Sequence, residues 1–198
     1  MPAGGAGASK AIVPAYRVGW VLTHQLFNLK PAHRSRTRTP DAVFLAERSG
    51  AGWREESFAA VREQARALAA GLLGLGLGPD TPILIISGNS VDHGILALAA
   101  QYVAIPIVPV AEQYALIPPA RAQLDYVAGL VKPGLIFGED GDALGEVLDR
   151  PSFAGAQKMI SRGTYDGALK LADVAKMGGD ITAAHASVGP DTVAKILM

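Results

Sequence analysis

The sequence contains no cysteine, few aromatic residues and no long hydrophobic run, and each shortage narrows what the protein can do. The lack of cysteine excludes disulfides, thiolate catalysis and cysteine-ligated metals, and it suits a reducing compartment. The apolar runs are far shorter than the ~20 residues that a membrane-spanning helix requires, and no signal peptide is visible. We therefore predict a cytoplasmic protein without a membrane span.

Charge is unevenly distributed, although the formal net charge is zero. Residues 1–40 contain six lysine and arginine residues and no acid, so the rest of the chain is acidic by the same amount. Transit peptides and nucleic-acid-binding arms can also begin in this way, but no aromatic residue lies between Lys30 and Arg38 and no basic helix follows. We interpret residues 1–40 as a basic, partly flexible leader and predict no nucleic-acid partner.

The remaining length and composition predict a folded domain. Of the 198 residues, 49% are hydrophobic and 18% are charged, and the mean hydropathy is +0.25. A compact chain of this size buries roughly 70% of its unfolded surface, so a sizeable core is expected. No internal repeat or second domain boundary is visible. We therefore treat residues 41–198 as one α/β subdomain.

The first elements of this subdomain follow from turn residues and periodicity. Residues 43–48 and 53–57 flank a glycine-bearing link, which predicts a β-hairpin. Apolar residues recur at helical spacing from residue 58, with Ser57 as a candidate N-cap. The glycines at 74, 76 and 78 resemble a dinucleotide-binding fingerprint, but a helix precedes them and a strand follows. We therefore interpret them as the end of the helix.

The segment 83–118 reads as strand, polar turn, helix and proline-edged strand. Ile83–Ile86 is an unbroken apolar run, which is typical of a strand covered on both faces. The turn that follows consists of Ser87, Gly88, Asn89 and Ser90 and can cap the next helix. Ligands of open α/β sheets bind at the carboxyl ends of the strands, so these four residues are our candidate ligand-facing loop.

The rest of the pattern predicts an α/β fold with helices layered on a mostly parallel sheet, preceded by the hairpin. We expect a helix from Pro119 that carries an apolar stripe as far as residue 131. The further elements are strands at 135–138 and 158–161, helices at 142–148 and 165–177, a segment at 178–189 that is mostly loop, and a strand at 192–198.

Other candidate sites have simpler interpretations. His93 lies near the start of a helix and could reach the strand ends, although a partly exposed histidine is the plainer reading. Ser87 follows a strand as in a nucleophile elbow, but the motif G-x-S-x-G is absent. Glu139, Asp140 and Asp142 could hold a cation or form an acidic surface turn. We assign no catalytic residue and no metal ligand.

Four blocks taken in order, at 53–77, 83–110, 130–137 and 183–198, resemble the amino-terminal part of AMP-forming acyl-CoA synthetases. The closest resemblance is to feruloyl-CoA synthases, and it covers residues 26–198. It implies a two-step reaction in which a carboxylic acid attacks the α-phosphate of ATP and the thiol of coenzyme A then displaces AMP. ATP, Mg²⁺ and coenzyme A are the implied cofactors of the parent enzyme.

The resemblance also implies that the chain is an incomplete amino-terminal subdomain. In relatives, the strand similar to residues 192–198 runs into a lysine-containing phosphate loop, whereas this chain stops at Met198. We expect the fragment to be inactive and to bind none of the cofactors tightly. Relatives also have Ala-Gly within the stretch similar to 102–106, so we expect altered packing where Ile105 adds volume.

Two alternatives come from other functional classes. The first is a non-catalytic interaction module in which the strand at 192–198 forms an exposed edge and pairs with another chain, including a second copy. The second is a nucleotide-binding domain without catalysis.

Overall fold

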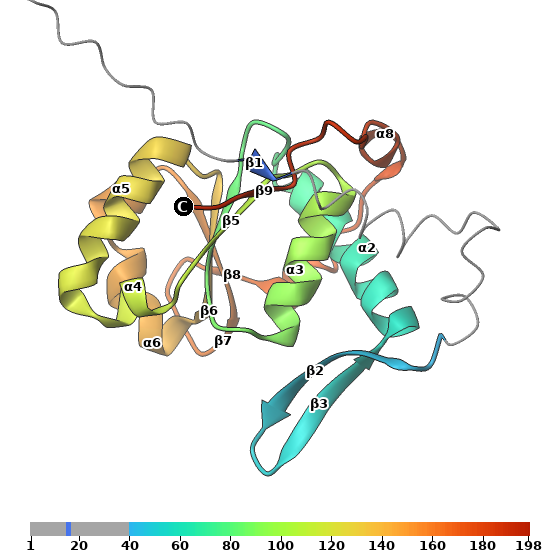
Figure 1. Ribbon diagram of the computed structural model, residues 1–198, viewed down its shortest axis with the longest axis horizontal. Helices are drawn as coiled ribbons and strands as arrows, with labels where there is room; N and C mark the ends of the chain where they lie inside the picture. Colours follow the sequence, from blue (N-terminus) through green and yellow to red (C-terminus); the bar gives the residue numbers. More distant parts are fainter. Residues whose placement is uncertain (1–14, 17–39) are drawn as a thin grey trace, which may run out of the picture.

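The computed structural model describes residues 15–16 and 40–198. In this part of the chain the strands form one seven-stranded sheet and a separate hairpin (Figure 1). The strands are β1 (Ala15–Tyr16), β2 (Val43–Ser49), β3 (Gly52–Ser57), β4 (Ile83–Ile86), β5 (Ile107–Val110), β6 (Leu135–Asp140), β7 (Gln157–Arg162), β8 (Leu169–Lys170) and β9 (Lys195–Ile196).

Helices connect most of these strands. The α-helices are α2 (Phe58–Gly74), α3 (Val91–Tyr102), α4 (Gln113–Leu116), α5 (Arg121–Val131), α6 (Gly141–Leu148), α7 (Leu171–Val174) and α8 (Thr182–Ala186). Two 3₁₀ turns, η2 (Pro118–Ala120) and η3 (Pro151–Phe153), complete the set.

The sheet has the strand order β1-β9-β5-β4-β6-β7-β8. The six strands from β9 to β8 are parallel, and only β1 runs antiparallel to its neighbour. The α/β fold with a mostly parallel sheet is therefore confirmed, as is the preceding hairpin β2-β3. Parallel strands end at the same edge, so the loops after β4, β5, β6 and β7 gather there.

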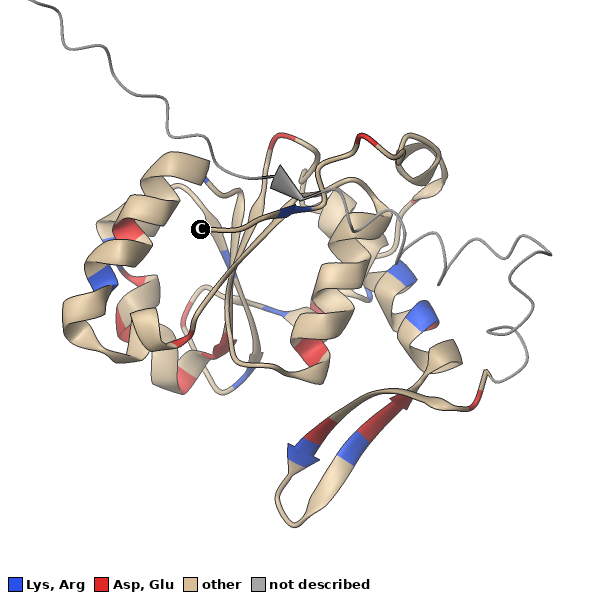
Figure 2. Cartoon of the chain, viewed as in Figure 1, with Lys and Arg blue, Asp and Glu red and all other residues tan. Residues whose placement is uncertain are grey.

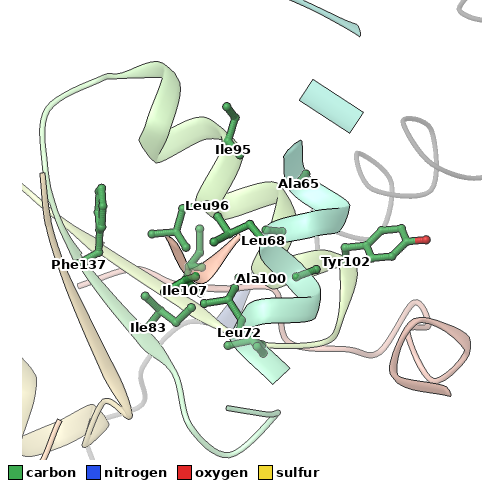
Figure 3. Packing of buried hydrophobic residues seen from close by; sticks show 14 of the residues in the cluster. Ala65, Leu68, Leu72, Ile83, Ile95, Leu96, Ala100, Tyr102, Ile107 and Phe137 are labelled. Carbon is green, nitrogen blue, oxygen red and sulfur yellow. The ribbon is translucent and has the colours of Figure 1, made fainter. Parts of the chain in front are cut away.

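Each face of the sheet carries its own hydrophobic cluster. In β4, Ile83 and Ile85 pack against α2, α3 and α7, whereas Leu84 and Ile86 pack against α5 and α6 (Figure 3 shows the first cluster). All four side chains are fully buried, as predicted for a strand covered on both faces. Figure 2 shows charged residues on the hairpin and the helices, while β4 and β5 carry none.

Local signals place α2 as expected. The side chain of Ser57 accepts a hydrogen bond from the Ala60 amide at 3.2 Å, which confirms the N-cap. The helix ends at Gly74, and Gly76 adopts a left-handed conformation with φ of 78°. The glycines therefore end the helix.

The predicted helix at residues 165–177 is wrong, whereas the prediction for residues 178–189 holds. The expected helix at 165–177 is replaced by β8 and the four-residue α7, because β8 completes the sheet by pairing with β7 and Gly167 is left-handed just before it. Residues 178–189 are mostly loop, as expected, and the five-residue α8 lies within them. Asp180 accepts a hydrogen bond from the Thr182 amide at the start of α8. At residues 165–177, tertiary pairing of β8 with β7 outweighed weak helical periodicity.

The last strand is shorter than predicted and does not form an edge. Within residues 192–198 only Lys195–Ile196 are extended and paired. β9 lies between β5 and β1, and β1 pairs with it in the register Ala15↔Ile196. The exposed carboxy-terminal strand that we expected is thus already paired. Apart from Ala15, Tyr16 and Pro40, the predicted leader lies outside the described residues.

In the stretch before β5, the backbone conformation that favours glycine occurs one residue earlier than expected. Ala104 has φ of 62°, in the left-handed region that favours glycine, whereas Ile105 is fully buried in the core. The volume of Ile105 is therefore accommodated by packing. The position that would favour a glycine is 104.

Candidate functional site

The candidate loop Ser87, Gly88, Asn89 and Ser90 lies at the carboxyl end of β4, where it was expected. Ser90 caps α3, because its hydroxyl accepts a hydrogen bond from the His93 amide at 3.1 Å. Ser87 is buried, while Asn89 is exposed. The loop thus combines a capping role with an accessible polar tip.

His93 is held against this loop by its Nδ1 atom. Nδ1 lies 2.9 Å from the hydroxyl oxygen of Ser87 and 3.2 Å from the carbonyl oxygen of Gly88. The Ser87 hydroxyl itself donates to the Gly88 carbonyl, at 3.1 Å. Because both neighbours of Nδ1 then accept, the proton of the neutral imidazole belongs on Nδ1 and Nε2 keeps a free lone pair.

Burial lowers the pKa of His93 below its ordinary value of 6.5, and the nearby charge of Lys195 lowers it further. The hydrogen bond to Gly88 opposes this shift without cancelling it. His93 is therefore neutral at pH 7. In this tautomer Nδ1 cannot take a proton from Ser87, so the pair is not set up as a nucleophile and its base.

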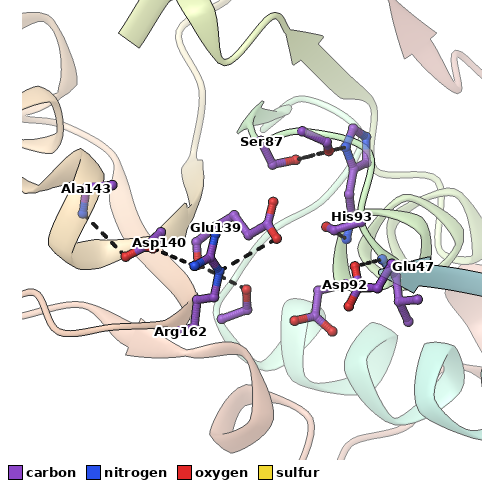
Figure 4. A network of polar contacts seen from close by, with 12 residues as sticks. Glu47, Ser87, Asp92, His93, Glu139, Asp140, Ala143 and Arg162 are labelled. Atoms are coloured by element: carbon purple, nitrogen blue, oxygen red, sulfur yellow. Dashed lines mark hydrogen bonds and ion pairs between the residues drawn. The ribbon is translucent and has the colours of Figure 1, made fainter. Parts of the chain in front are cut away.

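The hairpin contacts the start of α3, directly after this loop, through a carboxylate that no sequence pattern indicated. Glu47 of β2 accepts a hydrogen bond from the Val91 amide at 2.8 Å, in the first turn of α3 (Figure 4). Arg54 of β3 pairs with Glu47 at 3.2 Å and with Asp92 of α3 at 2.8 Å. Together, Glu47, Arg54 and Asp92 form a clamp that fixes the hairpin to α3.

Within the clamp, the positive charge of Arg54 is stabilised by the carboxylates of Glu47 and Asp92. Burial lowers the pKa of Arg54, but the hydrogen bond and charge of Asp92, helped by Glu47, outweigh it and the pKa is raised. Glu47 lies 44 residues before Val91, and no local motif links the two.

The neighbouring strands add more carboxylates at this edge. At the end of β6, Glu139 and Asp140 lie 3.9 Å and 2.7 Å from the guanidinium of Arg162 (Figure 4). Burial raises the pKa of Glu139, as do the charges of Glu112 and Glu47, whereas Arg162 and a hydrogen bond from Ser90 lower it. This edge of the sheet is therefore rich in negative charge.

The acidic residues predicted as either a cation site or a surface turn each have a structural partner. Asp140 accepts from the Asp142 amide at 3.0 Å and caps α6. Asp142 accepts hydrogen bonds from the amide and hydroxyl of Thr164, at 2.9 and 2.6 Å. Within residues 40–198, no group of three or more histidine or acidic side chains is arranged to hold a metal ion.

A pocket of about 260 Å³ opens between β2 and the first turn of α3. Its apolar wall comes from both elements, and its polar wall comes from the candidate loop and α3. The lining residues are Leu45, Ala46, Val91 and Gly94 on the apolar side and Asn89, Ser90 and His93 on the polar side. Two of the four predicted loop residues thus line a pocket, and none of the clamp residues does.

None of the helices in the described part of the chain has the length and apolar character needed to cross a membrane.

Comparison with solved structures identifies the fold. A benzoate CoA ligase from Burkholderia xenovorans LB400 superposes with a TM-score of 0.67 at 20% identity, over 87% of this chain and 31% of that one. MbtA from Mycobacterium smegmatis gives 0.67 at 20% identity, over 89% and 30%. ATP-bound MatB from Rhodopseudomonas palustris gives 0.63 at 23%, over 88% and 31%.

At these identities the likeness shows the fold alone, and the chain spans about a third of the length of these proteins. None of the curated proteins matches the sequence. The model of one family, described as AMP-binding enzyme, matches residues 32–196. Because that match covers most of the sequence, the chain belongs to the AMP-binding enzyme family.

Proposed function

We propose that this chain is the amino-terminal α/β part of an AMP-forming acid–CoA ligase. The family match over residues 32–196 is the observation that carries the proposal. The fold shared with a benzoate CoA ligase and with ATP-bound MatB supports it. In such a reaction a carboxylate displaces pyrophosphate from ATP to form an acyl-adenylate, and coenzyme A then releases AMP.

The substrate we propose is an aromatic carboxylic acid of the ferulate type, with fatty acids as the second class. The four sequence blocks that resemble feruloyl-CoA synthases support this choice. Mg²⁺ and coenzyme A are the further cofactors, and the cytoplasm is the proposed location. Ser87, Gly88, Asn89 and Ser90 are the proposed ligand-facing loop, because they end a central strand at the edge where parallel sheets bind ligands.

The described residues do not fit the phosphates of ATP at this edge. The amides of Val91 and His93 in the first turn of α3 are bonded to Glu47 and Ser90, so these two donors are not free to bind a phosphate. Glu47, Asp92 and Glu139 would also repel a polyanion. We therefore propose that phosphate binding and adenylation depend on other parts of a complete ligase, and that the 198 residues alone are inactive.

Pyrophosphate release tests the proposal. The 198-residue chain is compared with the product of the same gene read through its downstream coding sequence, each with ATP, Mg²⁺ and coenzyme A. We expect release from the longer protein with ferulate or another aromatic acid, and none from the shorter one. A longer protein that contains the family's remaining motifs but activates no aromatic or fatty acid would contradict the assignment.

Calorimetry separates this function from nucleotide binding without catalysis. Titration of the 198-residue chain with ATP and with AMP should give no heat of binding. Saturable binding of either nucleotide would favour the non-catalytic nucleotide-binding alternative. The interaction module that pairs through an exposed β9 has no structural support, because β1 already pairs with that strand.

A further inference from the structure

The β2-β3 hairpin projects from the body of the molecule (Figure 1). Side chains alternate between the two faces of a strand, and the register pairs Glu47 with Arg54 on one face and Arg48 with Trp53 on the other. The first face is turned towards the body, because Glu47 and Arg54 bond to the first turn of α3. The second face, which we call the outer face, carries its side chains away from these contacts.

The outer face presents an aromatic ring beside one charge of each sign. The ring of Trp53 is 58% exposed, and the guanidinium carbon of Arg48 lies 5.0 Å from its centroid. Glu55 follows two residues after Trp53 on β3, so it lies on the same face, and it is exposed. Trp53 therefore has Arg48 beside it across the hairpin and Glu55 beside it along its own strand.

The charges of the outer face are unmatched, unlike those of the face turned to the body. There, Arg54 pairs with both Glu47 and Glu56. Among the residues that the structure describes, neither Arg48 nor Glu55 forms an ion pair with another. A strongly acidic or strongly basic partner gains no net attraction from one charge of each sign. A second copy of the same face does, because each charge can meet its opposite.

A two-fold axis through Trp53 makes the outer face complementary to itself. Arg48 is about 5 Å from Trp53 across the hairpin and Glu55 is about 7 Å from it along the strand, which are similar steps. A two-fold rotation about the diagonal between these two directions therefore exchanges their positions. Arg48 of each copy then faces Glu55 of the other, and the two Trp53 rings meet at the axis. The strands of the two hairpins cross near a right angle, as in orthogonally packed sheets.

We propose that the outer face is a self-association site through which two copies of this chain form a transient symmetric dimer. The face is small, because strands of seven and six residues span only about 20 Å. The buried area then falls below the roughly 1,200 Å² of stable complexes, so a dissociation constant of about 0.1–1 mM is expected.

Sedimentation equilibrium of the 198-residue protein tests this proposal. The average mass should rise from the 20.5 kDa of the monomer towards twice that value as the concentration approaches about 1 mM. Arg48→Glu and Glu55→Arg each place like charges opposite one another in the dimer, so each variant alone should associate at least about tenfold more weakly. Trp53→Thr keeps a strand-forming residue but removes the ring at the axis, and it should also weaken association.

Mixing the two charge variants distinguishes this dimer from any other. In an equimolar mixture of Arg48→Glu and Glu55→Arg, opposite charges face each other again in the heterodimer. Its affinity should return to within about threefold of that of the unaltered dimer, as should self-association of the double variant. Glu63→Arg is the matched control, because it changes the net charge as Glu55→Arg does, at an α2 side chain that is 72% exposed. It should leave association unchanged.

Circular dichroism establishes that each variant is folded before sedimentation. A monomer at every concentration would overturn the proposal and leave the outer face to a different protein or to the remainder of a longer ligase. Association that neither charge reversal weakens, that Glu63→Arg weakens equally, or that the mixture does not restore would overturn it as well. Sedimentation does not depend on ligase activity, so failure here leaves the proposed function in place.

Discussion

Single residues determine where helices and strands begin and end, and only some of these residues can be recognised from the sequence. Ser57 and Ser90 cap helices as predicted, because a serine before an apolar helix is a local signal. Lys132 and Ala104 instead adopt left-handed conformations without being glycine. No property of their side chains predicts this, since the surrounding structure imposes it.

Replacing Lys132 with glycine should stabilise the protein. Lys132 ends α5 with φ of 47°, its amide bonds to the Ala128 carbonyl at 2.8 Å, and its side chain is exposed. Removing the Cβ relieves a cost of about 1 kcal/mol and loses little packing. Urea unfolding should show a gain of that order for Lys132→Gly and almost none for Lys132→Ala. Equal stability of the two variants would show that the backbone is unstrained.

The lowered pKa of His93 predicts a loss of stability in mild acid. The unfolded chain takes up a proton near the ordinary pKa of 6.5, whereas folded His93 resists it because of burial and Lys195. The unfolded state then binds more protons, so the free energy of unfolding falls as the pH drops below 6.5 and levels off below the folded pKa. His93→Gln should remove this part of the pH profile. A profile that is unchanged in the variant would contradict the assignment.

At the scale of elements, periodicity and turn residues predicted the long and strongly patterned pieces. The hairpin, α2, β4 and α6 were all placed within a few residues of their observed bounds. The failures lie at residues 165–177 and 192–198, where short elements owe their form to neighbours distant in sequence. β8 exists because β7 offers it a partner. Such partners are not visible in a local pattern.

Gly71 of α2 should be irreplaceable although alanine is the better helix former. An added Cβ would lie 2.0 Å from the carbonyl oxygen of Val174, so α2 and α7 would have to separate. We expect Gly71→Ala to destabilise the protein by about 1–3 kcal/mol in urea unfolding. Gly129→Ala on the exposed face of α5 meets no atom and should instead stabilise by about 0.5–1 kcal/mol. A gain in stability in both variants would show that Gly71 and the Val174 carbonyl are not in close contact.

Glu47 should contribute more to the stability of the fold than its position on a hairpin suggests. Its carboxylate caps the first turn of α3 and pairs with Arg54. We expect Glu47→Ala to cost about 1–2 kcal/mol, measured by thermal or urea unfolding, and to speed hydrogen exchange at the Val91 amide. Glu55→Ala removes an exposed carboxylate from the same hairpin and should change the free energy by less than about 0.5 kcal/mol. Similar losses of stability in Glu47→Ala and Glu55→Ala would show that removal of a negative charge, and not loss of the helix cap, is responsible.

At the scale of the whole molecule, the sequence indicated the class of fold but not how its pieces meet. The buried run of β4 predicted a strand covered on both faces, and the sheet has helices on both. The position of β1 beside β9, and of the hairpin across the start of α3, depends on contacts between residues far apart along the chain. The loop at 87–90 was found because a strand precedes it. The pocket beside it was not, since two of its seven lining residues belong to β2, which lies more than 40 residues earlier in the sequence.

The two clusters should unfold as one unit, because the strands between them contribute side chains to both. Ile85 belongs to the cluster under α2 and α3, and Leu84 to the one under α5 and α6, and both are fully buried. We expect Ile85→Ala and Leu84→Ala each to cost about 2–5 kcal/mol, since either change leaves a cavity beside the same central strand. Urea unfolding followed by circular dichroism should show a single transition at a lower midpoint with an unchanged slope.

Leu116→Ala, at a side chain that is 49% exposed, should leave the midpoint almost unmoved. Two separate transitions in the Leu84 variant, with α2 and α3 still protected from hydrogen exchange in the first, would show instead that each face of the sheet folds independently.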